Sequence, residues 1–201
     1  MFRSILVIFF LFFSVAAKAA DNPIVILETE FGDIHIELYV DAAPLSAGDF
    51  LRYASEGLFN GEGFYRTVKP SNDQGTPKIN VLQGGIISEQ AVHPMVPHEG
   101  TASTGIKNTQ GTIALARDAV GTGSAAYFFI NMTDNPGLDE GGTRNPDLAG
   151  YAAFGMVVRG MDVAQRIHQL DDRPLLGENY LAGQILTPPV VIHRVHIKKS
   201  D

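Results

Sequence analysis

Residues 64–68 read FYRTV and residues 79–85 read INVLQGG, with a loop of Pro, Ser, Asn, Asp and Gly between them. Short runs of β-branched and aromatic residues bounded by turn-forming residues predict two strands with a connection between them. Arg66 lies in the first run, directly after two aromatic residues. Because arginine is seldom buried without a partner, Arg66 taken alone is interpreted as a surface charge beside a strand. Other parts of the chain change this interpretation.

Strand patterns recur along the chain. Alternation of apolar and polar residues predicts an antiparallel hairpin over residues 24–30 and 34–39. Further β-prone runs occupy residues 112–116, 127–132, 152–158 and 188–197, and apolar stripes with helical spacing occupy residues 44–59 and 161–170. Loops are predicted over residues 86–110 and 133–150, which are interrupted by Pro and Gly. Many short strands with two separated helices favour a β-barrel or sandwich over an α/β fold.

The first residues have the layout of a secretory signal peptide. Arg3 provides a positive start, residues 5–13 are nine consecutive apolar residues, and residues 17–19 form a small-x-small site. The apolar run is shorter than the ~20 residues that a membrane-spanning helix needs. We therefore expect cleavage after Ala19 and export, most readily to a bacterial periplasm and otherwise by secretion. No stable membrane anchor and one domain over residues 20–201 are expected.

Composition excludes several classes of function. The formal net charge is −7 and no basic cluster is present, which argues against nucleic acid or an anionic membrane as the main partner. The chain has no cysteine, so it has no disulfide, thiolate nucleophile or cysteine zinc site.

Other catalytic arrangements are weaker alternatives. His93, His98 and Glu99 lie in a Pro-broken loop without the i, i+4 spacing that places metal ligands on one helix face, so no metal site is predicted. The adjacent Asp171 and Asp172 are expected to point apart rather than act as a carboxylate pair. A serine hydrolase would need a Gly-x-Ser-x-Gly elbow, which the sequence lacks.

Three stretches together resemble the cyclophilin family of peptidyl-prolyl cis-trans isomerases. They are residues 64–85, residues 111–131 with GTIALAR at 111–117 and YFFIN at 127–131, and FGMVVRGMDV at 154–163. The helix start APLSAGDF at residues 43–50 is also similar to the family's first helix. The resemblance covers residues 24–198. It implies an eight-stranded antiparallel β-barrel capped by an α-helix at each end, with no cofactor, in a monomer. Its substrates would be proline-containing polypeptides, and its role would be assistance in the folding of exported proteins.

The resemblance also assigns site residues. Arg66 matches the arginine of the family's Phe-x-Arg motif and is the predicted catalytic residue. Residues at substrate-binding positions are Phe64, Val81, Gln83, Ala116, Arg117, Phe129, Leu138 and Tyr151. Within this set, Phe64 is expected to pack behind the site, and Gln83 to hold the arginine or a substrate carbonyl. The backbone of Ala116 and Arg117 is expected to take up the substrate as an added strand. Phe129 is the predicted floor of the proline pocket.

Rotation about an X–Pro bond breaks no bond and only loses amide resonance, against a barrier of ~18–20 kcal/mol. It therefore needs a pocket that grips proline and a donor that favours the twisted amide. A guanidinium is always charged and carries several fixed donors, so Arg66 suits this task. An interaction that forms only in the transition state raises the rate.

Several positions depart from the family pattern. Asn80 stands where a pocket phenylalanine is usual, Val81 replaces a methionine, and Tyr151 stands where a histidine is common. Either Ile79 fills the space of the phenylalanine or the pocket is shallower. Gly137 replaces a tryptophan of cyclosporin-sensitive members, so weak cyclosporin binding is expected. The alternative function is a non-catalytic module that binds proline-containing segments as a chaperone.

Overall fold

The computed structural model describes residues 21–90, 92–170 and 179–198. The predicted signal peptide, residues 1–19, and the Asp171–Asp172 pair lie outside the described residues. Among the helices that are described, none is long and apolar enough to cross a membrane.

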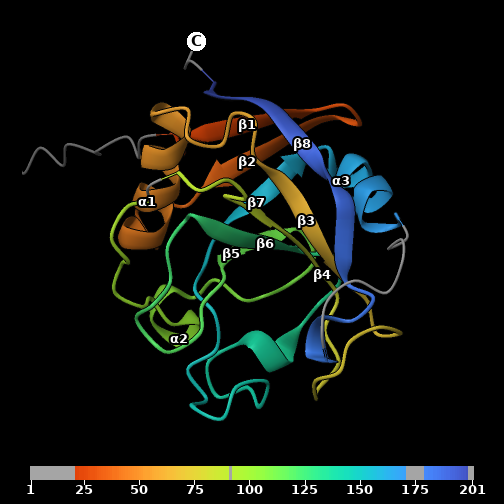
Figure 1. Cartoon of the computed structure of the whole chain (residues 1–201). Helices are drawn as coiled ribbons and strands as arrows, with labels where there is room; N and C mark the ends of the chain where they lie inside the picture. The colour runs from red at the N-terminus through yellow and green to blue at the C-terminus, as the bar shows by residue number, and fades with distance from the viewer. Residues whose placement is uncertain (1–20, 91, 171–178, 199–201) are drawn as a thin grey trace, which may run out of the picture.

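The described strands close into one antiparallel barrel (Figure 1). In chain order they are β1 Ile24–Thr29, β2 Gly32–Leu38, β3 Gly63–Val68, β4 Val81–Gly85, β5 Thr112–Leu115, β6 Tyr127–Asn131, β7 Ala153–Arg159 and β8 Ile185–Ile197. Around the barrel the order is β1-β2-β7-β5-β6-β4-β3-β8. The strand pair predicted from residues 64–85 is β3 paired directly with β4. The predicted fold class is confirmed.

Two helices lie on opposite sides of the barrel, α1 Pro44–Ser55 against β7 and β8, and α3 Met161–His168 against β2 and β4 (Figure 1). The first helix ends four residues before the predicted end at residue 59, because Gly57 adopts a left-handed φ of 70°. Leu58 N–H then donates to Tyr53 O at 3.0 Å and closes the turn. The predicted loops also contain short helices, namely the one-turn α2 Thr101–Thr104 and the 3-10 helix η1 Pro136–Leu138. A second 3-10 helix, η2, spans Asn179–Leu181.

Aromatic side chains fill the barrel interior. Fully buried rings are those of Phe50, Tyr53, Phe59, Phe64, Phe128 and Phe154. Their contacting ring centroids are 5.0–5.9 Å apart, in tilted, stacked and edge-to-face arrangements. Such packing adds to the stabilisation that follows from burial of apolar area. The core therefore occupies the inside of the barrel and leaves the outer faces of the strands free for a site.

A β-bulge at Tyr65 redirects the side chains of β3. In the β3–β4 register, Phe64 pairs with Gly84 and Arg66 pairs with Gln83, so Tyr65 is an extra residue. Phe64 and Arg66 would share a face in a regular strand, but the extra residue places them on opposite faces. Phe64 is buried in the core and Arg66 lines a cavity on the outside. Gly84 accommodates Phe64, because a Cβ there would lie 2.8 Å from Phe64 Cδ1.

Candidate active site

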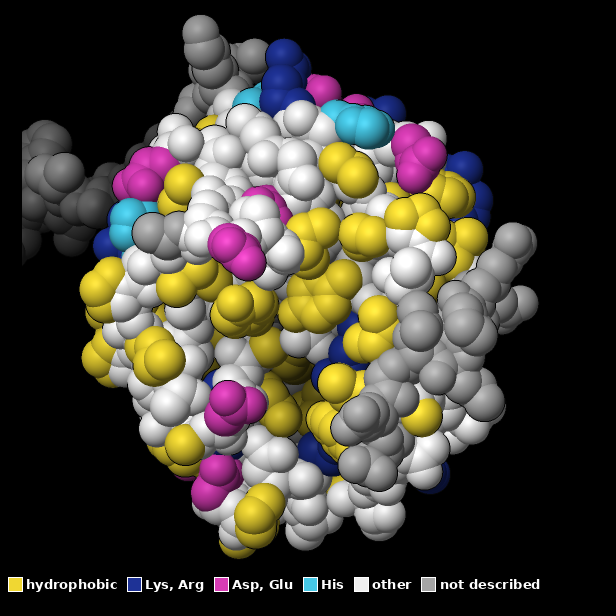
Figure 2. Space-filling model, in the orientation of Figure 1, with side chains coloured by type: hydrophobic (Ala, Val, Ile, Leu, Met, Phe, Trp, Pro, Cys, Tyr) yellow, Lys and Arg dark blue, Asp and Glu magenta, His cyan; other side chains and the backbone are white. Residues whose placement is uncertain are grey.

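A cavity of about 430 Å³ lies on the outer side of the barrel, over β3, β4 and β6. Figure 2 shows a hollow on the face in view, with hydrophobic side chains beside Lys and Arg atoms. The residues that line the cavity are Arg66, Val68, Ile79, Val81, Gln83, Met95, Ala116, Arg117, Asp118, Thr122, Tyr127, Phe129, Leu138, Arg144, Tyr151, Tyr180 and Leu181. These residues come from strands and from loops that are far apart in the sequence.

The structure brings together every predicted site residue except one. Arg66, Val81, Gln83, Ala116, Arg117, Phe129, Leu138 and Tyr151 all line the cavity. Phe64 does not, because its ring is fully buried in the barrel core, 5.9 Å from the ring of Phe128. This corrects the assignment of Phe64 to the substrate-binding set and agrees with its expected packing position behind the site.

Strand alternation on β6 separates the core from the cavity. Phe128 points into the barrel, whereas Phe129 belongs to a second apolar cluster on the cavity side, together with Val81 and Leu138. The rings of Phe129 and Tyr151 meet edge to face with centroids 5.4 Å apart. The floor of the cavity is thus apolar and closely packed.

Arg66 is held by two glutamines. Its Nη1 donates to Gln83 Oε1 at 3.0 Å, and its Nε and Nη2 donate to Gln184 Oε1 at 2.9 and 2.7 Å. No ion pair between Arg66 and a described carboxylate accompanies these bonds, so the hydrogen-bond partners of its guanidinium within the described residues are neutral amides. Three of the five guanidinium N–H groups are engaged in this way, which leaves two for another ligand.

Gln184 was not identified from the sequence. It is fully buried, and its Nε2 donates to Asn72 O at 2.8 Å, so both ends of its amide are fixed. Gln184 lies 118 residues from Arg66 in the chain and belongs to no recognisable motif. Tyr180 was missed for the same reason, although its ring centroid lies 5.2 Å from Arg66 Cζ in cation–π geometry.

Tyr65 orients the other glutamine. Gln83 Nε2 donates to the Tyr65 hydroxyl oxygen at 2.8 Å, which leaves Gln83 Oε1 facing Arg66. Burial raises the pKa of Tyr65 to about 12, although the charge of Arg66 and the hydrogen bond from Gln83 act in the opposite direction. The phenol therefore stays neutral across the physiological range.

Arg117, another lining residue of the cavity, is fixed by the hydrogen bonds of its side chain. Its Nη1 and Nη2 donate to Asp147 Oδ2 and Oδ1, both at 2.8 Å, and its Nε donates to Gly150 O at 2.8 Å. Arg117 Cζ also lies 5.2 Å from the ring centroid of Tyr151. The side chain is only 1% exposed while the residue as a whole is partly exposed, so its accessible part is backbone.

Ile79 rather than Asn80 lines the cavity. Asn80 is not among the lining residues, and its backbone N–H donates to Asn135 Oδ1 at 3.0 Å. Of the two hypotheses for this position, the structure supports the one in which Ile79 fills the space. Gly137 is closely covered, because a Cβ there would lie 2.3 Å from Pro77 Cγ, so this position has no room for a larger side chain.

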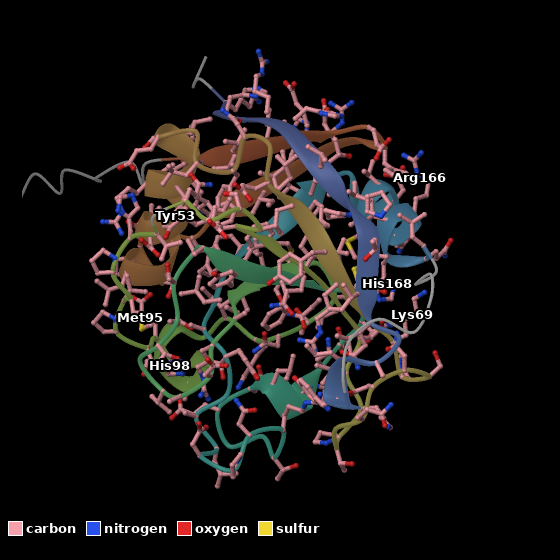
Figure 3. The ribbon with its side chains drawn as sticks, viewed as in Figure 1. Tyr53, Lys69, Met95, His98, Arg166 and His168 are labelled. Carbon is pink, nitrogen blue, oxygen red and sulfur yellow. The ribbon has the colours of Figure 1, made fainter. Side chains whose placement is uncertain are left out.

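The histidines considered as metal ligands do not come together. His93 Nε2 lies 2.7 Å from Glu56 Oε2, and His98, on the loop before α2 (Figure 3), has its Nε2 2.9 Å from Ala149 O. Glu99 instead accepts the N–H groups of Leu45 and Ser46 at the start of α1, at 3.1 and 2.7 Å. Within the described ranges, no group of three or more His, Cys, Asp or Glu side chains is arranged to hold a metal ion.

Comparison with known proteins identifies the family. Residues 24–197 match the model of the family described as cyclophilin type peptidyl-prolyl cis-trans isomerase/CLD. The chain belongs to this family. A peptidyl-prolyl cis-trans isomerase A from Dickeya dadantii is 36% identical over 94% of this chain and 91% of its own length. A peptidyl-prolyl cis-trans isomerase B from Escherichia coli is 35% identical over 71% of this chain and 82% of its own length.

A cyclophilin solved in the presence of the dipeptide Ala-Pro has the same fold. This cyclophilin type isomerase from Cryptosporidium parvum covers 88% of the chain and 99% of its own length, with a TM-score of 0.65 and 18% identity. The resemblance seen in the sequence is thus confirmed. The predicted isomerase activity is favoured over the non-catalytic module, because the curated relatives are themselves named isomerases.

Proposed function

We propose that the cavity isomerises X–Pro peptide bonds with Arg66 as its catalytic residue. The observation that carries this assignment is the environment of Arg66. Its guanidinium is fixed by the amides of Gln83 and Gln184 at the edge of an apolar cavity, and it retains free donors. Neutral partners fix the side chain without cancelling its charge, whereas a carboxylate would do both.

The mechanism follows from the electronic change in the twisted amide. In the planar amide the prolyl nitrogen shares its lone pair with the carbonyl and accepts no hydrogen bond. As the bond rotates, the lone pair returns to nitrogen, and a free N–H of Arg66 can donate to it. This bond exists only near the transition state, so it lowers the barrier rather than merely tightening binding. A donor that is already oriented needs no reorganisation at that moment.

The apolar floor of the cavity is the binding surface for the proline ring. Phe129 and Leu138 form the base of the cavity, and Ile79 and Val81 lie at its side. A proline ring placed there would be held while the residue before it rotates. The exposed backbone at Ala116 and Arg117 would receive the substrate chain in an extended conformation.

The biological setting is also part of the proposal. Residues 1–19 have the charge, apolar run and small-residue site of a signal peptide. We therefore place the mature protein outside the cytoplasm, most simply in a periplasm, as a monomer that assists the folding of exported proteins. Detection of a mature N-terminus after Ala19 in a periplasmic fraction would support this setting, and recovery of uncleaved protein in the cytoplasm would contradict it.

The decisive experiment is exchange of a short X–Pro peptide by NMR with wild type and Arg66→Ala. We expect Arg66→Ala to lower the exchange rate at saturation by about 100-fold, as for loss of one transition-state donor. The Kd for the peptide should change by no more than about threefold. Arg194→Ala is the control, because its side chain is 62% exposed and pairs with Glu28 on the β1–β8 surface. Equal losses of rate and affinity would contradict the transition-state role. Binding without acceleration by wild type would favour the non-catalytic module.

A further inference from the structure

Asp73 and Arg144 form a buried ion pair at the cavity, with Arg144 among the lining residues and Asp73 behind it. Arg144 Nη1 donates to Asp73 Oδ2 and Arg144 Nη2 donates to Asp73 Oδ1, both at 2.8 Å. The side chain of Arg144 is 6% exposed and that of Asp73 is 0% exposed. Asp73 lies on the loop between β3 and β4, whereas Arg144 lies on the loop between η1 and β7. A carboxylate–guanidinium pair with two parallel bonds fixes orientation as well as distance. The pair therefore locks two distant loops together at the cavity.

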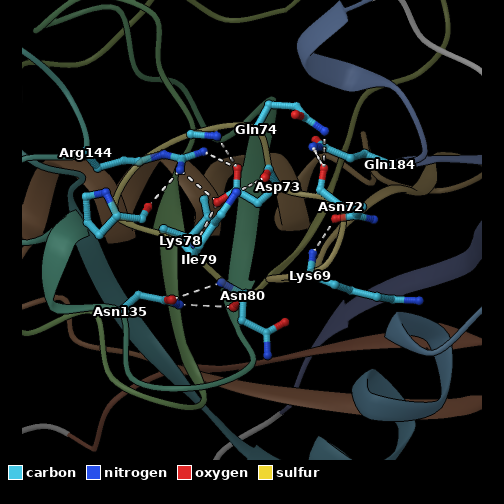
Figure 4. Close-up of polar contacts among 12 residues, drawn as sticks. Lys69, Asn72, Asp73, Gln74, Lys78, Ile79, Asn80, Asn135, Arg144 and Gln184 are labelled. Carbon is cyan, nitrogen blue, oxygen red and sulfur yellow. Dashed lines mark hydrogen bonds and ion pairs between the residues drawn. The ribbon is translucent and has the colours of Figure 1, made fainter.

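The same carboxylate sets the course of its own loop (Figure 4). Asp73 Oδ1 accepts the N–H of Gly75 and Oδ2 accepts the N–H of Ile79, both at 2.9 Å. Arg144 Nη1 donates a further bond to Pro77 O at 2.9 Å. Since Ile79 lines the cavity, its backbone position depends directly on Asp73 and through it on Arg144.

Asn135 fixes the next residue from a different direction (Figure 4). Its Oδ1 accepts from Asn80 N–H and its Nδ2 donates to Asn80 O, both at 3.0 Å. Residues 79 and 80 are thus held on one side by the ion pair and on the other by an amide, immediately before β4 begins at Val81.

Ile79 needs this support because of its size. A short aliphatic side chain contacts a proline ring only if its backbone is correctly placed. A gap of about 0.5–1 Å already removes about a quarter to a half of each van der Waals contact. An ion pair costs desolvation energy when it is buried, and that cost is offset only where the geometry and extra hydrogen bonds are good, as they are around Asp73.

We propose that Asp73 and Arg144 are positioning residues whose ion pair fixes Ile79 as a wall of the proline pocket. This inference rests on the proposed function of the cavity. The pair does not act on the reacting bond. It acts on the affinity for the proline-containing segment, whereas Arg66, with its glutamine partners, acts on the rate.

The test separates affinity from rate in the mature protein. Asp73→Asn keeps the size of the side chain but removes its charge and places an amide N–H toward Arg144. With an X–Pro peptide we expect about a tenfold rise in Kd, while the exchange rate at saturation stays within about threefold of wild type. Ile79→Ala should raise Kd by a similar factor. The Asp73→Asn and Ile79→Ala changes combined should raise Kd little beyond Ile79→Ala alone, because both remove the same contact.

A matched control isolates the general effect of losing a buried carboxylate. Glu62 is 4% exposed and accepts the N–H groups of Ile87 and Ser88 on another loop, and none of these residues lines the cavity. Glu62→Gln should lower the Tm, as Asp73→Asn does, but leave Kd within about twofold of wild type. If Asp73→Asn unfolds, Arg144→Lys, which keeps the charge but loses the two parallel bonds, replaces it and should raise Kd at least about threefold. Because Arg144 itself lines the cavity, this variant is also combined with Ile79→Ala, and the combined change should raise Kd little beyond Ile79→Ala alone.

The outcomes are distinct. An unchanged Kd in Asp73→Asn, or additive effects of Asp73→Asn and Ile79→Ala, would overturn the positioning role. Equal changes of Kd in Asp73→Asn and Glu62→Gln would also overturn it, because they would indicate a general structural effect. A wild type that binds the peptide but does not accelerate its exchange overturns the proposed function, and the Kd comparison still decides the role of the pair.

Discussion

Arg66 and Gln83 are direct partners in the β3–β4 register, and Arg66 Nη1 donates to Gln83 Oε1 at 3.0 Å. This pairing exists because the bulge at Tyr65 turns Arg66 out of the barrel while Phe64 stays inside. Tyr65 then uses its own hydroxyl to orient Gln83. Bulges of this kind re-aim side chains at functional sites. The extra residue Tyr65 thus has two effects: it turns the Arg66 side chain towards the cavity, and its hydroxyl accepts the hydrogen bond that orients Gln83.

Gln184→Met should lower catalysis more than binding. Methionine keeps the length of the side chain but leaves the Nε and Nη2 groups of Arg66 without their acceptor. We expect about a tenfold lower exchange rate at saturation, equivalent to ~1.4 kcal/mol, with Kd within about twofold. Exchange NMR with the X–Pro peptide measures both. Gln165→Met, on the exposed face of α3, is the control and should leave both unchanged. A Gln184 variant with wild-type rate would show that Gln83 alone positions Arg66.

The neighbouring residues Phe128 and Phe129 should affect different properties when changed to leucine: Phe128 the stability of the fold, and Phe129 the affinity for the peptide. Phe128→Leu removes ring contacts in the barrel core and should lower the free energy of unfolding by about 1–2 kcal/mol without changing Kd. Phe129→Leu removes part of the cavity floor and should raise Kd about fivefold. Urea unfolding and peptide titration measure the two quantities. A larger effect of Phe128→Leu on Kd than of Phe129→Leu would contradict the separation of core and cavity.

Tyr65 should ionise only in strongly alkaline solution. Its pKa is raised from 10.0 to about 12, so the neutral phenol is favoured in the folded state. The stability linked to Tyr65 is therefore fully present below pH 10 and is lost as the pH rises through about 12. The difference in phenolate absorbance between wild type and Tyr65→Phe should show a step near pH 12. A step near pH 10 would contradict burial of the phenol.

The Arg117–Asp147 pair should persist in acid. Hydrogen bonds from Arg117 and from Ala149 N–H lower the pKa of Asp147 from 3.8 to about 2. A lowered carboxyl pKa adds stability that is present above the unfolded value and lost as the pH falls through the folded value. The Tm difference between wild type and Asp147→Asn should therefore be constant above pH 3.8 and shrink as the pH falls towards 2.

Asp162→Asn controls for charge removal at a site that is 79% exposed. Its Tm difference from wild type should be small throughout the same pH range, because exposed ion pairs contribute about 0–1 kcal/mol. If Asp147→Asn behaves in the same way as Asp162→Asn, Arg117 does not depend on its carboxylate partner.

The local patterns of the sequence predicted most of the strands and the two main helices, and they favoured a β-barrel or sandwich. The resemblance to cyclophilins then selected the eight-stranded barrel, which the structure confirms. Alternation predicted β1 and β2, and apolar stripes predicted α1 and α3, because each pattern depends on neighbours within a few residues. Arg66, Gln83 and Phe129 were found through motifs that resemble those of cyclophilins, and the structure gathers them around one cavity. Export, cleavage after Ala19 and the monomeric state stay predictions.

Contacts between distant segments were decided only by the tertiary structure. The sequence left open whether Ile79 or Asn80 lines the cavity, and it gave no sign of Gln184 as the second support of Arg66. The bulge at Tyr65 and the Asp73–Arg144 pair also escaped prediction. A strand pattern states that side chains alternate but not where an extra residue interrupts the alternation. The Arg66–Gln184 and Asp73–Arg144 partners lie more than 70 residues apart in the chain and come close only when the barrel and its loops have folded. A pattern of neighbouring residues contains no information about such contacts.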